Sequence, residues 1–409
     1  MKALMCHLYY KYPGGEDVVY EDECWLLQEY GHEVVRYEAQ NSQIDTMGKI
    51  DLARKSFWNP ETYRDIRELI QRESPDVVHC ANTFPLFSPS LYQAAKDEGV
   101  PTVQTLHNFR LACVGGTLLR NGEVCHKCLG KAMPLSGIIH RCYQGSLTAS
   151  TVSALMHSYH RRRGTWSRLI DQYILLTPHS KEIFTAAGLP PERMTVKPNF
   201  VRPDPGFHDS RSKKNYAVFV GRLSKEKGLD VLMDAWSELS EFPDLELLIV
   251  GEGPLRGLVE SAAQRDPRIR LAGQLPRDQT MQCIGAAKFL VFPSVWYETF
   301  GRTIIEAQAC GTPVIASNMG AMATLIQHDQ TGLLFEPGNA MQLAERCRNL
   351  LADEQLQKRL SVEGRAHYER EFSAETNLLQ LLNVYNKAGV NLADPSESNV
   401  GVSSEKLPS

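Results

Sequence analysis

The sequence of 409 residues lacks an excess of either charge, since 44 Lys and Arg face 48 Asp and Glu for a net charge of −4. This mildly acidic balance excludes a protein that wraps nucleic acid through an overall positive surface, so no nucleic-acid partner is expected. No apolar run approaches the roughly 20 residues of a membrane-spanning helix. The ten cysteines are too few for a disulfide scaffold of this length. What remains is a globular protein of ordinary composition, with 43% apolar and 22% charged residues.

The amino-terminal residues also lack the features of a targeting segment. Their apolar run is short, it stops at the Tyr12–Gly15 turn, and no cleavage-like site follows it. We therefore expect a cytoplasmic enzyme. A basic cluster at 161–163 (three arginines), with His157, His160 and Arg168 nearby, is either a solvated face or a surface for anionic lipid or a lipid-diphosphate acceptor. Peripheral contact with the inner face of a membrane is thus an open alternative.

Short apolar runs alternate with longer helical stretches in both halves of the chain. The runs of strand length are Leu4–Tyr9, Val34–Tyr37, Val77–Cys80, Thr102–Leu106, Tyr173–Thr177, Tyr216–Val220, Leu245–Val250, Ile269–Leu271, Phe289–Phe292, Val314–Ala316 and Leu333–Phe335. This alternation is typical of parallel sheets covered by helices, and the compact runs fit strands buried on both faces. The sequence predicts an α/β fold of two Rossmann-like, doubly wound parallel-sheet domains that face a central cleft, where ligands bind at the carboxyl ends of the strands.

A stretch rich in proline and polar residues, 201–214, separates the two halves and has the composition of a linker. We expect an N-terminal domain over 1–200 and a C-terminal domain over 215–375. A C-terminal helix over 376–390 can pack back on the N-terminal domain. The last 19 residues, 391–409, have little to bury and are expected to form a disordered tail.

The most informative segment runs from Trp296 to Ala316, directly after a predicted strand. Its two carboxylates, Glu298 and Glu306, are separated by seven residues, with Gly301 between them. If a helix begins near Gly301, its free N–H groups and positive dipole end suit an anionic diphosphate. Glu306 would lie farther along the helix, near the hydroxyls of a ribose. The alternative is a pair of solvated glutamates on a surface helix.

Glycines follow other predicted strands. After Gly221, Arg222 and Lys227 stand just past a strand end, where they would neutralise phosphate, although two basic residues are also common in a solvated loop. The Val250–Gly253 and Gly14-Gly15 turns either bring the backbone close to a phosphate or merely turn the chain. The Gly14-Gly15 turn is not the GxGxxG fingerprint, so it lends no support to a nicotinamide cofactor.

Taken in order, these motifs resemble those of the retaining glycosyltransferases of family 4, which have the GT-B fold. The resemblance spans residues 2 to about 340 and rests on Pro13-Gly14-Gly15, Thr105–Asn108, Pro198-Asn199, Val220–Arg222, Lys227-Gly228, Val250–Gly253, Phe292–Ser294, Glu298–Glu306, and Asn339 after Phe335–Gly338. It implies transfer of a sugar from a nucleotide-diphospho-sugar, bound by the C-terminal domain, to a hydroxyl of a saccharide or lipid-linked acceptor on the side of the N-terminal domain. Such a transfer would serve polysaccharide, lipopolysaccharide or glycolipid assembly. It also implies retention at the anomeric carbon and no catalytic metal. A nucleotide-sugar epimerase or phosphorylase, and a non-catalytic nucleotide-sugar-binding protein, are the alternatives.

The resemblance implies a role for each matching side chain. Glu298 would hold hydroxyls of the donor sugar, and Glu306 would bind the nucleotide ribose. Arg222 and Lys227 would stabilise the leaving diphosphate in place of a metal, because charge develops there in the transition state. His107 would bind a sugar hydroxyl and help to place the acceptor, although a histidine at a strand end is more often structural.

Further donor contacts follow from the same resemblance. They would come from the N–H groups of the segment Phe300-Gly301-Arg302, from the hydroxyl of Thr303, and from the close backbone approach of Gly14, Gly15, Gly221 and Gly251. The sequence departs from the family pattern at two positions. Arg302 stands where relatives usually carry an apolar residue, and Asn108 replaces a commoner acidic partner of the histidine.

Four of the ten cysteines crowd one loop-like insertion at about 108–145, with the spacing C-x11-C-x2-C-x13-C: Cys113, Cys125, Cys128 and Cys142. Such a set can form a tetrahedral structural zinc site that orders a loop without a core of its own, with His126 and His140 as alternative ligands. Free or redox-active thiols and disulfides remain the other options. The insertion follows His107, so we expect it to shape the acceptor side of the cleft. The other six cysteines are expected to be buried as small apolar residues.

Overall fold

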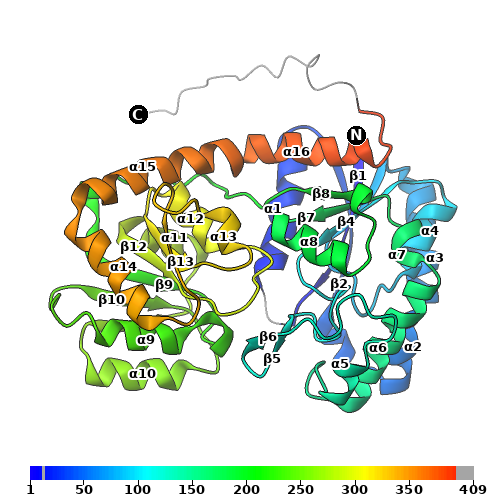
Figure 1. Cartoon of the computed structure of the whole chain (residues 1–409). Coiled ribbons are helices and arrows are strands. Elements are labelled where there is room, and N and C mark those ends of the chain that lie inside the picture. The colour runs from blue at the N-terminus through cyan, green and yellow to red at the C-terminus, as the bar shows by residue number, and fades with distance from the viewer. Residues whose placement is uncertain (12–13, 393–409) are drawn as a thin grey trace.

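The computed structural model describes residues 1–11 and 14–392 and contains two α/β domains side by side (Figure 1). Each domain is built on a six-stranded sheet in which every pairing is parallel. The predicted pair of doubly wound domains is therefore confirmed. Residues 12–13 of the expected turn and residues 393–409 of the expected tail lie outside the described residues.

The N-terminal sheet has the strand order β2-β1-β3-β4-β7-β8. Its strands are β1 Lys2–Tyr9, β2 Glu33–Gln40, β3 Val77–Cys80, β4 Thr102–Leu106, β7 Gln172–Leu175 and β8 Met194–Val196. The helices of this half are α1 Gly15–Glu29, α2 Lys49–Phe57, α3 Pro60–Glu73, α4 Ser90–Asp97, α5 Leu135–Ile139, α6 Leu147–Arg162, α7 Thr165–Arg168 and α8 Pro178–Ala186, with 3-10 turns at Asn41–Thr46 and Pro191–Arg193. A small antiparallel hairpin of β5 Leu119–Arg120 and β6 Glu123–Val124 projects from the insertion.

The C-terminal sheet has the order β11-β10-β9-β12-β13-β14. Its strands are β9 Lys214–Val220, β10 Glu246–Val250, β11 Ile269–Gly273, β12 Ala287–Phe292, β13 Val314–Ser317 and β14 Leu333–Phe335. The helices are α9 Leu229–Ser237, α10 Arg256–Arg265, α11 Arg277–Ala286, α12 Arg302–Ala309, α13 Met322–Leu325, α14 Ala340–Ala352, α15 Glu354–Glu371 and α16 Ala374–Lys387, with 3-10 turns at Ser210–Ser212 and Lys225–Lys227. None of the helices within residues 1–11 and 14–392 is both long and apolar enough to cross a membrane.

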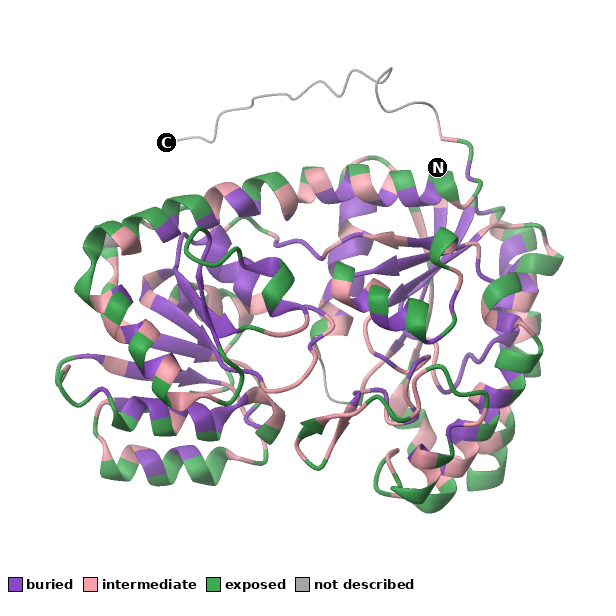
Figure 2. Cartoon of the chain, in the orientation of Figure 1, coloured by how far each residue is buried: buried purple, intermediate pink, exposed green. Residues whose placement is uncertain are grey.

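Burial explains why the strands form where they do. All residues of β3, β4 and β7 are buried, and the central strands of both sheets lie between covering helices (Figure 2). Such strands need side chains that are apolar on both faces, which is why a continuous apolar run marks them in the sequence. The expected strand at Tyr173–Thr177 ends at Leu175, because Thr177 caps α8 by accepting a hydrogen bond from the Ser180 N–H at 3.2 Å.

The two domains are connected by two crossings of the chain. The linker after β8 is held on α15, where Arg365 Nη1 pairs with Asp204 Oδ1 at 2.6 Å. Helix α15 then leads into α16, which lies along the N-terminal domain (Figure 1). Leu381, Val384 and Tyr385 of α16 share an apolar core with β1 and α1. The C-terminal helix thus completes the core of the domain at the other end of the chain.

Two glycines allow the loops after β9, β10 and β12 to touch. At Gly251, where φ is +143°, an added Cβ would lie 1.9 Å from the Gly221 carbonyl oxygen. At Gly228, where φ is +68°, it would lie 2.0 Å from the Pro293 carbonyl oxygen. Only glycine fits such contacts. These loops meet at the carboxyl ends of the strands, where the site described next is built.

Candidate functional site

The centre of the site is an ion pair between two loops of the C-terminal domain. Lys227 Nζ lies 2.6 Å from Glu298 Oε1, and the Ser294 hydroxyl donates to the same oxygen at 2.8 Å. Glu298, in the loop between β12 and α12, is only 7% exposed. The Lys227 ammonium also lies 5.7 Å from the centre of the Phe292 ring and 5.8 Å from that of Trp296. The structure therefore brings together two residues that are 71 positions apart in the sequence.

Helix α12 begins at Arg302 with Gly301 at its N-cap, the position at which the sequence places the start of a helix. Gly301 supplies no side-chain cap, so the first N–H groups of the helix lack that partner. The Thr303 hydroxyl beside them is buried without a hydrogen-bond partner. An open helix start next to a lysine favours an anionic ligand.

A buried carboxylate of the N-terminal domain holds the arginine at this helix start. Asp22 of α1 is 2% exposed, and its Oδ2 accepts from Arg302 Nη2 at 2.7 Å. Arg202 Nε and Arg277 Nη1 lie 2.8 and 3.1 Å from Asp22 Oδ1. Arg302 Nε also donates to Glu306 Oε1 at 2.9 Å. We call Asp22 and these three arginines the Asp22 cluster; it joins α1, the linker, α11 and α12.

The Asp22 cluster explains the departure at Arg302. Burial alone would lower the pKa of Arg302, but Glu306 and Asp22 outweigh burial and raise it, so the guanidinium stays charged. Sequence reasoning missed Asp22, because a charged residue on a helix is ordinarily expected to face solvent. In the structure Trp25 is half-buried, whereas Asp22 and Glu23 are buried. The three consecutive acids Glu21, Asp22 and Glu23 between the buried residues Tyr20 and Cys24 were the available signal.

Glu23 has a partner as well, since its Oε1 accepts from Lys197 Nζ at 2.8 Å and both side chains are 1% exposed. Burial alone would raise the pKa of Glu23, but Lys197 holds it below the usual value. The segment after β8 is thereby fixed to α1. The predicted motif residue Asn199, two positions on, is buried.

His107 stands directly after β4, opposite the C-terminal loops. Its backbone carbonyl accepts from the Thr299 hydroxyl at 2.8 Å, a contact that bridges the two domains. The Nε2 atom is buried without a partner. Burial lowers the pKa of His107 despite the neighbouring Glu16 and Glu23, so the imidazole is neutral near pH 7. A neutral ring with a free nitrogen can bind a hydroxyl group.

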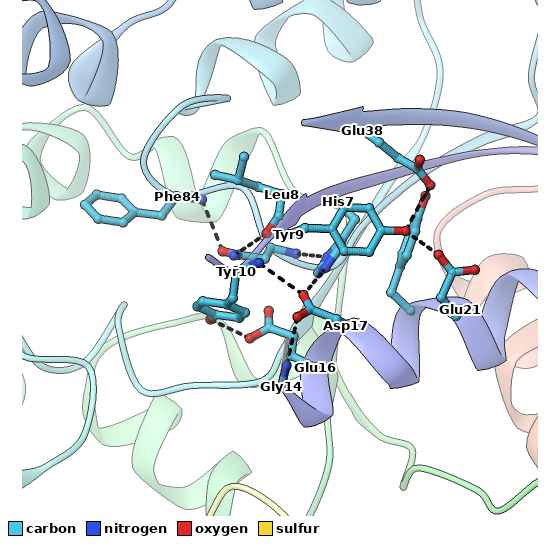
Figure 3. A network of polar contacts seen from close by, with 12 residues as sticks. His7, Leu8, Tyr9, Tyr10, Gly14, Glu16, Asp17, Glu21, Glu38 and Phe84 are labelled. Carbon is cyan, nitrogen blue, oxygen red and sulfur yellow. Dashed lines mark hydrogen bonds and ion pairs between the residues drawn. The ribbon is translucent and has the colours of Figure 1, made fainter. Parts of the chain in front are cut away.

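Gly14 and Gly15 open α1 beside a network of polar contacts (Figure 3). Gly14 N donates to Asp17 Oδ2 at 2.9 Å, and Asp17 Oδ1 lies 2.8 Å from His7 Nε2. The Tyr10 hydroxyl donates to Glu16 at 2.7 Å. An added Cβ at either glycine would meet no atom of the described residues within 4 Å, so these residues leave space beside the two glycines.

Arg222 is exposed just past β9, and within residues 1–11 and 14–392 its side chain has no hydrogen bond or ion pair. Of the residues predicted for the site, Lys227 and Glu298 contact each other directly, and Arg302 contacts Glu306. Gly221 and Gly251 meet through their loops, since Gly221 N donates to Val250 O and Gly251 lies against the Gly221 carbonyl. Arg222 therefore lies at the exposed edge of the candidate site.

The four cysteines of the insertion are free, half-buried thiols. Burial and, to a smaller extent, the thiols of Cys113, Cys142 and Cys125 raise the pKa of Cys128 to about 11, which places the four sulfurs in one neighbourhood. Across the described part of the chain, however, no three His, Cys, Asp or Glu side chains are arranged to hold a metal ion. The geometry therefore gives the zinc prediction no support. Among the other six cysteines, Cys283 is half-buried rather than buried.

Two family models match consecutive parts of the chain. The model described as Glycosyltransferase Family 4 matches residues 13–205, and the model described as Glycosyl transferases group 1 matches residues 202–367. The chain is a family 4 glycosyltransferase. It is accordingly a transferase of glycoconjugate biosynthesis, as its resemblance implied.

Known relatives extend over most of this glycosyltransferase. An uncharacterized glycosyltransferase of Methanocaldococcus jannaschii is 23% identical over 394 residues, which cover 94% of this chain and 98% of the relative. N-acetyl-alpha-D-glucosaminyl L-malate synthase of Bacillus anthracis is 25% identical over 78% of this chain and 76% of its own length. Among solved structures, that of Anabaena HepE in complex with UDP has a TM-score of 0.66 at 19% identity and covers 94% of this chain and all of its own. This structural similarity shows the GT-B fold.

Proposed function

We propose that this glycosyltransferase moves a sugar from a nucleotide-diphospho-sugar to a hydroxyl acceptor, with retention of the anomeric configuration and without a catalytic metal. The observation that carries the proposal is the Lys227–Glu298 pair beside the open start of α12. It offers a fixed cation, free N–H groups and a carboxylate within one set of loops. HepE has been crystallised with UDP and with UDP-glucose, which is the ligand chemistry that such loops suit.

In this proposal the N-terminus of α12 and Lys227 bind the diphosphate of the donor. Arg222 also contacts the diphosphate when the donor enters the site. Their positive charges stabilise the negative charge that develops on the leaving group, which is the main electrostatic requirement of the reaction. Glu298 accepts hydrogen bonds from sugar hydroxyls. Glu306, whose Oε1 is engaged by Arg302, keeps its Oε2 for the ribose. No side chain is assigned as a covalent nucleophile.

The acceptor enters from the N-terminal domain. His107 offers its free, neutral imidazole to a hydroxyl, and the Thr299 contact holds it against the loop that carries Glu298. Gly14 and Gly15 leave open space for donor or acceptor next to α1. In retaining transfer on one face of the sugar, the leaving oxygen itself can take the acceptor proton, so no strong base is required from the chain.

Two measurements test the proposal. Thermal shift with UDP-, GDP- and ADP-sugars is expected to raise the melting temperature with one base, because a ligand that binds only the folded state stabilises it by mass action. NMR of the product is expected to show the anomeric configuration of the donor. An inverted product contradicts the mechanism, and donor binding without transfer to any acceptor favours a non-catalytic binding protein. Epimerised donor, or sugar release that requires phosphate, favours the other enzyme classes.

We further propose a peripheral position at the cytoplasmic face of a membrane, where the insertion docks on anionic lipid. Ile139 at the end of α5 is 71% exposed, Leu135 and Leu147 are also exposed, and all three are close in sequence to the exposed basic residues His140 and Arg141. Apolar side chains beside cations suit the boundary between headgroups and acyl chains. Ile139→Ser is expected to weaken co-sedimentation with anionic vesicles severalfold, whereas the exposed Leu379→Ser on α16 should not. Equal binding by both variants contradicts the proposal.

The zinc prediction has its own measurement. Elemental analysis of the purified full-length chain is expected to find about one zinc per chain if the four thiols bind metal. A chain that folds and binds its donor with no zinc removes the prediction and leaves the cluster as free thiols.

A further inference from the structure

A small cavity of about 60 Å³ opens beside His107 in the N-terminal domain. Its polar wall follows the carboxyl ends of β3 and β4 and includes Asn82, Thr83, Asn108 and Arg110. Ligands of parallel sheets bind at such strand ends. Arg110 belongs to neither the Lys227–Glu298 pair nor the Asp22 cluster, and the roles assigned above do not use it.

Arg110 is held in place without a charge partner. Its guanidinium carbon lies 4.3 Å from the centre of the Phe84 ring and 5.5 Å from that of Tyr143. Its Nε and Nη1 atoms are buried without hydrogen-bond partners, and within residues 1–11 and 14–392 no carboxylate pairs with it. The two aromatic rings fix the guanidinium, and its donors remain free.

No acid among the described residues forms an ion pair with this cation. Glu16 of α1 accepts a hydrogen bond from the Tyr10 hydroxyl through Oε2, and its Oε1 is buried without a described partner. Burial and, to a smaller extent, the charge of Arg110 lower the pKa of His157 to about 3, so His157 is neutral. A guanidinium that is partly removed from water and lacks a counter-charge is costly, and an entering anion removes the cost. Its planar fork matches phosphate and carboxylate oxygens.

We infer that Arg110 binds an oxyanion, a phosphate or carboxylate group, and that this group belongs to the acceptor. The glycosyltransferase then selects acceptors that carry a negative charge near the reacting hydroxyl. The assignment of the anion to the acceptor rests on the proposed function, whereas the anion site itself does not. Because the cavity also contains His107, the anion and the hydroxyl to be glycosylated would be held by residues three positions apart.

Calorimetric titration of the full-length protein with methyl phosphate tests the anion site. Arg110→Met keeps an apolar stem between the rings and removes the charge, and it is expected to weaken binding by roughly tenfold or more. Arg110→Lys should restore part of the affinity, because it keeps the charge without the fork. Arg162→Gln, on the exposed basic surface, should leave methyl phosphate binding within about twofold of wild type.

Stability adds a second readout. Without ligand, Arg110→Met is expected to melt no lower than wild type, because it removes an uncompensated charge. Methyl phosphate should raise the melting temperature of wild type but not of this variant. Phosphate binding that is lost in Lys227→Met and kept in Arg110→Met overturns the inference, since the anion then occupies the donor site. Absence of phosphate binding in a protein that still binds a nucleotide-sugar also overturns it.

The same variants separate the two proposals and the two sources of phosphate. Arg110-dependent phosphate binding without nucleotide-sugar binding refutes the proposed function and leaves the anion site standing. If binding to phosphatidic acid vesicles falls in Arg110→Met more than in Arg162→Gln, the site accepts a lipid phosphate. If only the soluble phosphate depends on Arg110, the site accepts a soluble anionic acceptor.

Discussion

Glu298→Gln is expected to lower kcat/KM for sugar transfer by about 10²–10³-fold, the usual loss when one preorganised electrostatic group is removed. The substitution keeps the shape of the side chain and its contact with Ser294, but it removes the charge that pairs with Lys227 at 2.6 Å. Steady-state kinetics with the cognate nucleotide-sugar measures the effect. Circular dichroism and the melting temperature show whether the fold is kept.

Lys227→Met is expected to give a loss of similar size, through weaker stabilisation of the leaving diphosphate. Because Lys227 and Glu298 contact each other, the double variant should lose less activity than the product of the two single effects. Lys225→Met is a matched control, since Lys225 belongs to the same 3-10 turn but is exposed. Normal turnover of Glu298→Gln or Lys227→Met would remove these residues from the mechanism.

Asp22→Asn is expected to lower the free energy of unfolding by roughly 3 kcal/mol, because three arginines lose the carboxylate that they share. We take the low end of the range for a broken buried pair, since Arg302, Arg202 and Arg277 remain 16%, 28% and 32% exposed and water screens part of their repulsion. Urea unfolding measures the loss. Asparagine keeps the volume of the side chain, so the effect reports on charge.

The Asp22 cluster also predicts a change in donor binding. When Asp22 no longer holds Arg302, the arginine can turn wholly toward Glu306, the residue proposed to bind the ribose of the donor. The KM for the donor is therefore expected to rise more than kcat falls. Glu21→Gln is the control on the same helix: Glu21 is 41% exposed and pairs with Arg36, so its loss should cost at most about 1 kcal/mol. Equal stability of the two variants would show that the Asp22 cluster does not hold the domains together.

Much of the fold could be predicted from local patterns. The expected strands Val77–Cys80, Thr102–Leu106 and Leu333–Phe335 coincide with β3, β4 and β14. A strand that is buried on both faces requires an unbroken run of apolar residues, and such a run can be recognised directly in the local sequence. Strand β8 and the β5–β6 hairpin were not predicted, because they have only three and two residues per strand and a run so short carries no periodicity.

The site could be predicted only in part. Glu298, Gly301 and Lys227 could be proposed from the sequence, because a strand end, a glycine and a nearby charge form a local signal. Asp22 and Arg110 were not, because their importance depends on their neighbours in space: Asp22 meets an arginine 280 positions away, and Arg110 forms no ion pair with any acid among the described residues. A sequence shows which charges exist but not which ones are paired.

The sequence by itself determined the parallel-sheet architecture of this protein, its family, and the loops that carry the proposed donor site. Each depends on residues close together in the chain, where spacing and burial leave a pattern. Only the tertiary structure decided that Arg302 is bound across the cleft by Asp22 and that Arg110 stands unpaired beside His107. The physical reason is that electrostatic pairing depends on distance in space and on exclusion of water, and both are set when the two domains pack together.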